Sequence, residues 1–566
     1  MAAFCIIQSV RRSVLPELIM KIRIGIIYVF IGVTIWCGLC VVYVNRGSFK
    51  QSFLKITHFR LFRVLHRWPD VTNNDATTTG RLYLIEEILR KGSKFNVSET
   101  TDASRSSMYV KRKSSYRVGD LIQIQIDLYD SQGKRKKTGG DFLRVWMEDS
   151  KNSNSVSGQV FDHNNGSYTA VVKAVWVGQG TIRAFIATRR EEILYRYKIF
   201  EKYASLWITY FVFRKDKLEE TNGCSIRVPA DEKSGNWCNF TMENNGFPWY
   251  CLKPKNKQLT CSMWTISFSG VAIAYKLNTS EDTVARWSSK DPKPDILQSP
   301  LNVFIASEDK TSTEAFSQVA CNKLPPKLTW QRKSPNGYFL HGKWHSLLCT
   351  DKLPRTINAY RQCLKGRTLW LPGDSTSTQF KTSLHSFLKF KSHSRGHEPV
   401  IDTDSGYNFS ISFHAHEFPF YHGHSRCSRS TNQAEDIILD HLPNTTKDIV
   451  VLYLYIHFSF VHPDVFRQHV RRLVPSAKNL LARAPNVTLA VRGPHAFFRS
   501  ERGLLSYWGL LYADIWHEEF ASLQDRIVYL DFWDFSMALE LDNVHPPLNT
   551  VDKMVHHMMS LLCHRK

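Results

Sequence analysis

Acidic residues are scarce in this sequence: 51 Asp and Glu stand against 74 Lys and Arg, which gives a formal net charge of +23 over 566 residues. The sequence also lacks the composition of a collagen, a coiled coil or a fully disordered chain, because 43% of its residues are hydrophobic and 22% are charged. No nucleic-acid-binding motif accompanies the positive charge, so we expect no nucleic-acid partner. A chain of this length favours two or three domains.

An uncharged apolar run covers residues 24–44 and would span about 31 Å as an α-helix, the thickness of a bilayer core. Basic residues precede it, so the positive-inside rule predicts a cytosolic tail over 1–23, a transmembrane signal anchor over 24–44 and a stem over 45–80. This is the arrangement of a single-pass type II membrane protein. The alternative is a cleaved signal peptide that starts at Met20, which would give a secreted protein. In both cases the remaining chain enters the secretory pathway.

Sequons and cysteines agree with a luminal location. Seven Asn-x-Ser/Thr sequons are candidate glycosylation sites: Asn96, Asn165, Asn239, Asn278, Asn408, Asn444 and Asn486. Nine of the twelve cysteines lie beyond the apolar run and are disulfide candidates in an oxidising lumen: Cys224, Cys238, Cys251, Cys261, Cys321, Cys349, Cys363, Cys427 and Cys563. Because nine is odd, one thiol is free or pairs with another chain.

Short alternating strands dominate residues 115–186. The segment from Leu121 to Leu128 alternates apolar and polar residues with period two, and glycine-containing turns separate it from similar segments. Several such strands predict an immunoglobulin-like β-sandwich. Four cysteines between Cys224 and Cys261 then punctuate a stretch that we expect to be rich in loops, where disulfides replace a thin core.

Strands and helices alternate beyond a linker predicted over 306–335. The segment 368–371 and the apolar run 449–455 are predicted as buried parallel strands, and 376–390 as a helix. Helical spacing continues over 465–484, although Pro475 should break or kink that helix. We therefore predict a three-layer α/β domain over 336–566, whose ligand site lies at the carboxyl ends of the strands.

Two short motifs carry the chemistry. Gly373-Asp374-Ser375 follows the first predicted strand, and Asp542-Asn543-Val544-His545 lies near the C-terminus. In an acyl-transfer site a serine attacks, a histidine takes its proton and a carboxylate orients the imidazole. We therefore predict Ser375, His545 and Asp542 as catalytic residues, with the Ser375 N–H at a helix N-terminus facing the oxyanion. The alternative without a catalytic role is that Asp542 and His545 are a solvent-exposed pair in a loop, because each motif also occurs by chance.

The order of these motifs is typical of SGNH/GDSL esterases and acyltransferases, which the C-terminal half resembles. The first half carries Val118-Gly-Asp-Leu, Gly139-Gly-Asp-Phe-Leu, Asp162-His-Asn-Asn-Gly-Ser-Tyr and Trp249-Tyr-Cys-Leu-Lys-Pro, which resemble the neurexophilin domain. From about residue 75 to 566 the chain is similar to the neurexophilin and PC-esterase domain (NXPE) family. The resemblance implies an α+β multidomain protein, with a neurexophilin-like sandwich and cysteine-rich segment over 81–305 and a PC-esterase, SGNH-hydrolase-like domain over 336–566.

The resemblance also implies further residues around the oxyanion and the substrate. Gly423 would offer a second backbone N–H, and Gly373, Asp374 and His457 would lie beside it. The sequence departs from the family pattern at Tyr455, where relatives have glycine. It departs again at Ser377 and Thr378, since relatives have a basic residue at one of these positions before the glutamine that matches Gln379. These departures leave the three predicted catalytic residues in place but put the choice of substrate, and activity itself, in question.

Two His-x-His pairs, which suit zinc on strands, occur at His414, His416, His422 and His424. No carboxylate completes an obvious ligand set, so we favour a histidine-rich loop near the active site and predict no metal.

The function that these features predict is a luminal carbohydrate O-acyl transferase or esterase, acetyl being the expected acyl group. Family relatives acetylate polysaccharides and sialic acids, and the basic charge suits an acidic or sialylated glycan. No bound cofactor is expected, although acetyl-CoA is a candidate acyl donor, and the expected location is the Golgi or secretory-pathway membrane. The alternative is a non-enzymatic, neurexophilin-like adhesion or signalling ligand for a cell-surface receptor, with a degenerate esterase domain.

Overall fold

The structure is a computed structural model, and it describes residues 97–110, 115–228, 234–272, 295–297, 300–307, 319–390, 399–416, 432–498, 506–539, 541 and 543–565. The chain divides into two compact units, Met1–Asp75 and Ala76–Lys566, and every described residue belongs to the second. The predicted tail, anchor and stem lie outside the described residues. Within the described part, no helix combines the length and the apolar character that crossing a bilayer requires.

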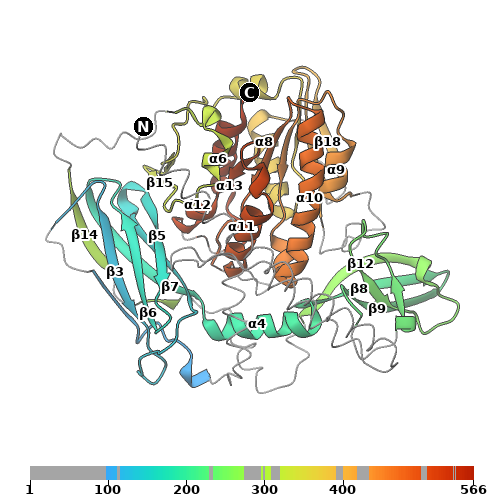
Figure 1. The fold of residues 1–566 in the computed structure, drawn as a ribbon, viewed down its shortest axis with the longest axis horizontal. Helices are drawn as coiled ribbons and strands as arrows, with labels where there is room; N and C mark the ends of the chain where they lie inside the picture. Colours follow the sequence, from blue (N-terminus) through green and yellow to red (C-terminus); the bar gives the residue numbers. More distant parts are fainter. Residues whose placement is uncertain are drawn as a thin grey trace, which may run out of the picture. The chain divides into compact units, whose positions relative to one another are not determined.

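The first sheet is antiparallel apart from one pairing, β14 with β2, and its strands are hydrogen-bonded into one connected path (Figure 1). We predicted an immunoglobulin-like β-sandwich for this region. Strands from both ends of the path bury side chains in the same core, as a sandwich requires, while hydrogen bonds join all of them into one connected sheet. In path order the strands are β1 (Ser107–Val110), β3 (Leu121–Asp127), β6 (Ser167–Lys173), β5 (Asn154–Asp162), β4 (Phe142–Asp149), β7 (Gly178–Thr188), β14 (Leu301–Ala306) and β2 (Tyr116–Arg117).

Three further strands extend this sheet. β13 (Asp295–Ile296) pairs with β7, and β15 (Gly337–Leu340) pairs with both β16 (Lys343–Ser346) and β5. The last pairing places Phe339 opposite Ser155. A strand from the beginning of the C-terminal half therefore belongs to the first sheet.

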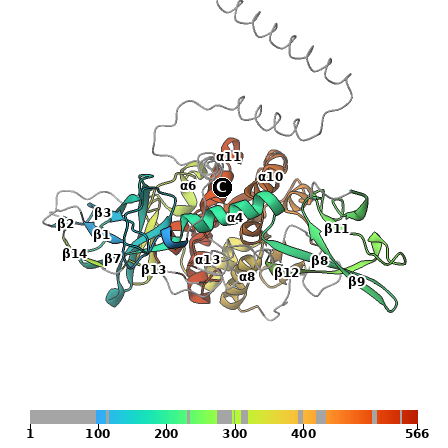
Figure 2. The same cartoon turned by 90° about the horizontal axis from the view of Figure 1, so that it is seen from below.

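A second, five-stranded antiparallel sheet includes the cysteine-rich segment. Between β9 and β12 the segment contributes only two strands of three residues each, so it is rich in loops, as predicted. Helix α4 (Arg190–Tyr203) connects the first sheet to this one (Figure 2). In order across the sheet, the strands are β10 (Trp237–Asn239), β11 (Tyr250–Leu252), β9 (Leu218–Ser225), β8 (Trp207–Lys215) and β12 (Trp264–Ala272).

Four disulfides join eight of the nine candidate cysteines, and Cys427 lies outside the described residues. Two of them crosslink strands and loops of the second sheet, one joins residue 321 to residue 349, and one joins two distant parts of the C-terminal domain. The pairs are Cys224–Cys251, Cys238–Cys261, Cys321–Cys349 and Cys363–Cys563.

The third sheet is parallel except for its edge strand β18, as the alternating pattern predicts. Its central strand β20 points Val450 and Leu452 into one hydrophobic core and Ile449 and Val451 into another, so both faces are covered. Its strand order is that of a doubly wound sheet with the switch point between β17 and β20. The strands in order are β18 (Val400–Asp404), β19 (Phe409–Phe413), β17 (Thr368–Trp370), β20 (Ile449–Leu452), β21 (Thr488–Arg492) and β22 (Val528–Leu530).

Helices pack on both faces of this sheet (Figure 1). The predicted helices occur, and α10 runs through Pro475 without ending there. The helices of the C-terminal half are α6 (Pro326–Thr329), α7 (Ile357–Leu364), α8 (Ser375–Leu388), α9 (Glu435–His441), α10 (Pro463–Arg483), α11 (Tyr507–Glu519), α12 (Trp533–Met537) and α13 (Leu548–Leu562), and a short 3-10 helix, η7, covers Ile456–Phe460.

Contacts between the two halves are dense and reach the carboxyl edge of the third sheet. The Phe185 ring lies edge-on against Phe498, with ring centroids 4.6 Å apart. The buried Arg144 guanidinium donates to the carbonyl of Ser536 over 3.3 Å. After α4, the N–H of Leu206 donates to the carbonyl of Phe460 over 2.7 Å. The first half therefore packs against α12 and against the segments that follow β20 and β21.

Candidate active site

The turn before Ser375 needs a glycine. Gly373 has a φ of +145°, and a Cβ there would lie 3.1 Å from the carbonyl oxygen of Tyr453. Its N–H donates to the carbonyl of His414 over 2.9 Å, and its own carbonyl accepts from the N–H of His416 over 3.0 Å. Both backbone groups of Gly373 are thus engaged in extending the pairing of β17 with β19. The role of Gly373 in this geometry is to let the chain turn sharply into α8.

Asp374 is buried and caps the N-terminus of α8. Its carboxylate accepts from the N–H and hydroxyl of Thr376 over 2.8 and 2.7 Å and from the N–H of Ile456 over 3.0 Å. Burial alone would raise the pKa of Asp374, but the neighbouring His416 and His457 rings and the Thr376 hydrogen bond hold this pKa below its usual value. Since an ionised carboxylate can only accept hydrogen bonds, Asp374 supports the turn and cannot donate to an oxyanion.

Ser375 and His545, 170 residues apart, lie in hydrogen-bonding contact. The Oγ atom of Ser375 is 2.7 Å from Nε2 of His545. Ser375 is the first residue of α8 and is partly exposed, whereas His545 is exposed and precedes α13. Within the described part of the chain, no acceptor takes the N–H of Ser375. A free N–H at the N-terminus of a 14-residue helix faces the position where negative charge would develop on a substrate carbonyl.

Two of the predicted site residues, Asp542 and Gly423, lie outside the described residues, so their roles stay predictions. His457 lies on η7, where its Nδ1 donates to the carbonyl of His416 over 2.8 Å. Its ring stands edge-on to His416, with centroids 5.3 Å apart. His457 therefore lies near Asp374, and its charge contributes to the lowered pKa of that carboxylate.

The histidines considered for metal binding do not gather a ligand set in the described residues. Among these residues, no group of three or more metal-ligating side chains is close enough to hold an ion. The buried His416 instead faces Glu435 of α9, with Nδ1 3.4 Å from Oε1. His422 and His424 lie outside the described residues.

A buried arginine, which our sequence analysis missed, lies under the nucleophile. The Arg492 guanidinium is sandwiched between the rings of Phe380 and Tyr453, at 3.7 and 4.0 Å from their centroids. One of its nitrogens donates to the Thr376 hydroxyl over 3.2 Å. Burial lowers the pKa of Arg492 from its ordinary value. A charged residue at the end of the otherwise uncharged strand β21 was the available signal.

The sequons that the structure describes all have an exposed asparagine. In two of them the asparagine side chain already bonds the third residue of the sequon: Asn165 Oδ1 accepts from the N–H of Ser167 over 3.0 Å, and Asn239 Oδ1 from that of Thr241 over 2.9 Å. Glycosylation itself stays a prediction, and Asn96 and Asn278 lie outside the described residues. The exposed asparagines are Asn165, Asn239, Asn408, Asn444 and Asn486.

The fold and this site define an α/β domain with a serine–histidine pair at the carboxyl edge of a parallel sheet, joined to a β-rich N-terminal half. Comparison with known families places both parts. Residues 344–563 match the family model described as "NXPE family member 4-like, C-terminal domain", and residues 88–283 match the model described as "Neurexophilin". The chain belongs to the NXPE family.

Proposed function

We propose that this protein is a carbohydrate O-acyl transferase or esterase that works through an acyl group held on Ser375. The observation that carries the proposal is the 2.7 Å contact between Ser375 Oγ and His545 Nε2 at the switch point of the sheet. A serine hydroxyl becomes a useful nucleophile only when a base removes its proton, and a neutral imidazole within hydrogen-bonding distance is such a base.

The proposed reaction has two halves. Ser375 Oγ attacks the carbonyl carbon of the acyl donor while its proton passes to His545 Nε2, and the carbonyl oxygen becomes an oxyanion facing the Ser375 N–H. Collapse of this intermediate breaks the bond to the leaving group, which takes the proton from His545. The hydroxyl of an acceptor, or water, then attacks the acyl-serine by the same steps in reverse. One oxyanion donor of this kind contributes about 3–4 kcal/mol to the transition state.

Asp542 is proposed to orient the imidazole and Gly423 to supply a second oxyanion donor. The first assignment comes from the sequence motif and the second from the family resemblance, because neither residue is described by the structure. The arrangement at Gly373 and Asp374 supports a structural role for these two residues, which hold the nucleophile in place.

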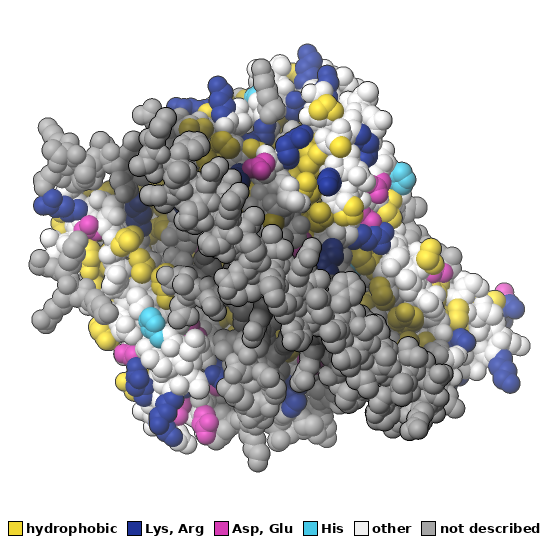
Figure 3. Space-filling view, viewed as in Figure 1, with side chains coloured by type: hydrophobic (Ala, Val, Ile, Leu, Met, Phe, Trp, Pro, Cys, Tyr) yellow, Lys and Arg dark blue, Asp and Glu magenta, His cyan; other side chains and the backbone are white. Residues whose placement is uncertain are grey.

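The acceptor is proposed to be an acidic or sialylated glycan and the donor an acetyl ester or acetyl-CoA. The exposure of His545 supports a bulky acceptor, and the net charge of +23 supports an acidic one. Lys and Arg side chains are scattered over the face drawn in Figure 3, so their charge favours general attraction over one basic site. The proposed location is the secretory pathway, behind an N-terminal anchor or after its cleavage.

The proposal is tested with a fluorophosphonate probe, which reacts covalently with activated serines. We expect the purified full-length protein to be labelled at Ser375, with labelling abolished in Ser375→Ala and reduced at least about 10²-fold in His545→Ala. Thr382→Ala, on the exposed side of the same helix, is the matched control and should be labelled like the parent. Incubation with acetyl donors and a glycan panel, followed by mass spectrometry, then identifies donor and acceptor.

The alternative proposal is a binding module, and the match of residues 88–283 to neurexophilin favours it. It predicts a well-folded protein that the probe does not label. Absence of labelling at Ser375 in the folded parent would therefore reject the enzyme and leave the ligand-like function.

A further inference from the structure

The backbone on each side of His545 is held by a side-chain N–H group. On one side, Nε2 of His495 donates to the carbonyl oxygen of Val544 over 2.9 Å. On the other side, Nε2 of Gln379 donates to the carbonyl oxygen of Pro546 over 2.9 Å. The N–H of His545 itself donates to the side chain of Asn543 over 3.1 Å. The segment that carries the imidazole is therefore attached to the rest of the domain at the residues directly before and after it.

Gln379 ties this segment to the nucleophile. It lies on α8 four residues after Ser375, which is about one helical turn, so both side chains lie on the same face of the helix. Gln379 is partly buried. Because a helix turn is rigid, a bond from Gln379 to Pro546 fixes the distance between the backbone of His545 and the backbone of Ser375.

His495 ties the same segment to the sheet. It is fully buried after β21, and its own carbonyl accepts from the hydroxyl of Tyr455 over 3.0 Å. Burial and the nearby Arg492 lower the pKa of His495 to about 4, so the ring is neutral and carries one N–H. A carbonyl oxygen can only accept, which places this proton on Nε2, facing Val544.

Tyr455, three residues after the end of β20, packs against His495. Its buried ring lies edge-on to the His495 ring, with centroids 5.7 Å apart. A glycine at this position could make neither this contact nor the hydroxyl bond to the His495 carbonyl. The tyrosine thus extends the support of the histidine segment back to the central strand.

We propose that Gln379 and His495 are positioning residues that together hold His545 within proton-transfer distance of Ser375. This inference rests on the proposed function, in which Ser375 is the nucleophile. Neither residue touches the reacting atoms, and each acts through the backbone of the segment 544–546. Displacement of a general base by a fraction of an ångström slows the chemical step and leaves ground-state binding unchanged.

The test uses the full-length protein with three variants and one control. Gln379→Leu and His495→Leu remove the donors at similar volume, whereas His495→Gln keeps an amide N–H at about the same reach. Thr382→Ala is the control on α8. Two quantities are measured: the maximal rate and the half-saturation concentration for fluorophosphonate labelling of Ser375, and the rate at which diethyl pyrocarbonate modifies His545, followed by peptide mass spectrometry.

We expect each leucine variant to label about tenfold more slowly at saturating probe, with an unchanged half-saturation concentration. Modification of His545 by diethyl pyrocarbonate should become several-fold faster, since the imidazole is released from Ser375. His495→Gln should recover most of the labelling rate, which a purely structural role would not produce. Parent-like labelling rates in both leucine variants would overturn the proposal.

The two measurements separate the failure of this inference from that of the proposed function. If the folded parent is not labelled at Ser375, the proposed function fails, and the modification rate of His545 decides the positioning role by itself. An unchanged rate in both leucine variants then refutes it. If His495→Leu does not fold, Gln379→Leu decides, because Gln379 is partly exposed and its replacement leaves no buried cavity.

Discussion

The first sheet and the third sheet bury their strands in different ways. In β3 the residues Ile122, Ile124 and Ile126 are fully buried while their neighbours are exposed or half-buried, so one face meets solvent. In β20 all four residues are buried, because helices cover both faces. A sheet covered on both faces can present polar groups only at its strand ends, and Ser375 and His545 lie at such an edge. In the proposed enzyme the chemistry is therefore confined to the C-terminal half, and the first half contributes to that chemistry only by packing against it.

Removal of a disulfide is the change with the largest expected effect, and it compares the domain of the third sheet with the second sheet. Cys363–Cys563 closes a loop of 200 residues around the third sheet, whereas Cys224–Cys251 closes 27 residues of the second sheet. In the chain-entropy account, removal of the long crosslink costs about 5 kcal/mol and removal of the short one about 3.5 kcal/mol.

Urea unfolding of the double variants Cys363→Ala/Cys563→Ala and Cys224→Ala/Cys251→Ala, followed by tryptophan fluorescence, measures both costs. The variant without the long crosslink should have the lower unfolding midpoint. A lower midpoint for the other variant would show that the second sheet, and not the α/β domain, limits the stability of the chain.

The patterns that predicted the C-terminal half are local, and this explains what could be foreseen. The apolar run that contains β20 and the glycine turn before Ser375 are visible in short windows of sequence. The pairing of β15 with β5 joins Phe339 to Ser155, and no window of sequence carries that information.

The supports of the site are missed for the same reason. His495 meets Val544 across 49 residues and Gln379 meets Pro546 across 167 residues. Such bonds depend on where the fold places backbone carbonyl groups. Every residue has a carbonyl group, so these positions leave no pattern in the sequence. The contact between the serine and the histidine could be predicted because the proposed acyl transfer demands those residue types. The residues proposed to position them follow from geometry alone.

The contact between the halves is tested by Phe185→Ala. Phe185 is fully buried between Trp146 and Phe498, with ring centroids 5.4 and 4.6 Å away. We expect the free energy of unfolding to fall by about 4 kcal/mol, through lost burial and the cavity left behind. Phe304→Ala, on the same sheet but 59% exposed, is the matched control and should cost less than about 0.5 kcal/mol.

Labelling of Ser375 in the folded Phe185→Ala protein shows whether the packing of the first half also tunes the chemistry. Phe498 follows His495 by three residues, so a loosened contact should slow labelling a few-fold at most if the hydrogen bonds of His495 and Gln379 persist. Complete loss of labelling in the folded variant would contradict the confinement of the proposed chemistry to the C-terminal half.

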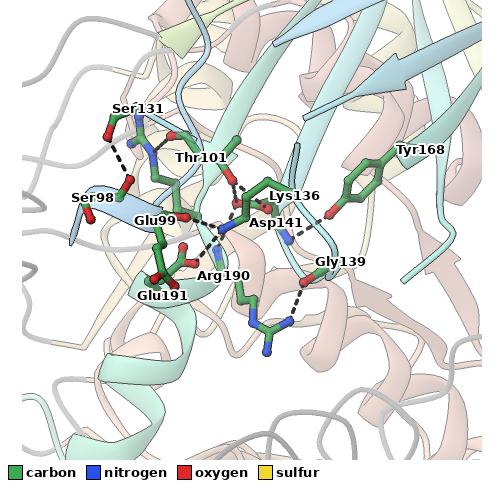
Figure 4. A network of polar contacts seen from close by, with 11 residues as sticks. Ser98, Glu99, Thr101, Ser131, Lys136, Gly139, Asp141, Tyr168, Arg190 and Glu191 are labelled. Atoms are coloured by element: carbon green, nitrogen blue, oxygen red, sulfur yellow. Dashed lines mark hydrogen bonds and ion pairs between the residues drawn. The ribbon is translucent and has the colours of Figure 1, made fainter. Parts of the chain in front are cut away.

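The smallest of the expected changes in stability concerns a buried polar network where the first sheet meets α4 (Figure 4). The carboxylate of Asp141 accepts from the Thr101 hydroxyl over 3.0 Å and from the first N–H of α4, that of Arg190, over 3.2 Å. Nearby, the Lys136 ammonium pairs with Glu191 over 3.1 Å. Burial, and next the negative charge of Glu191, raise the pKa of Asp141 from 3.8 to about 6, and the charge of Lys136 only partly opposes them.

This raised pKa makes the network less stable as the pH increases. The folded state holds the proton of Asp141 up to about pH 6, whereas the unfolded chain loses it near pH 4, so ionisation favours unfolding in between. A rise of about two units corresponds to about 3 kcal/mol, lost between about pH 4 and 6 and constant above. Between about pH 4 and 6 the unfolding free energy of the parent should fall as the pH rises, and Asp141→Asn should lack this pH dependence. The control Asp216→Asn, at an exposed turn, should keep the pH dependence of the parent. Parallel curves for the parent and Asp141→Asn would mean that Lys136 keeps Asp141 ionised in the fold, and that the first half, like the third sheet around Asp374, stabilises its buried carboxylate by neighbouring positive charge.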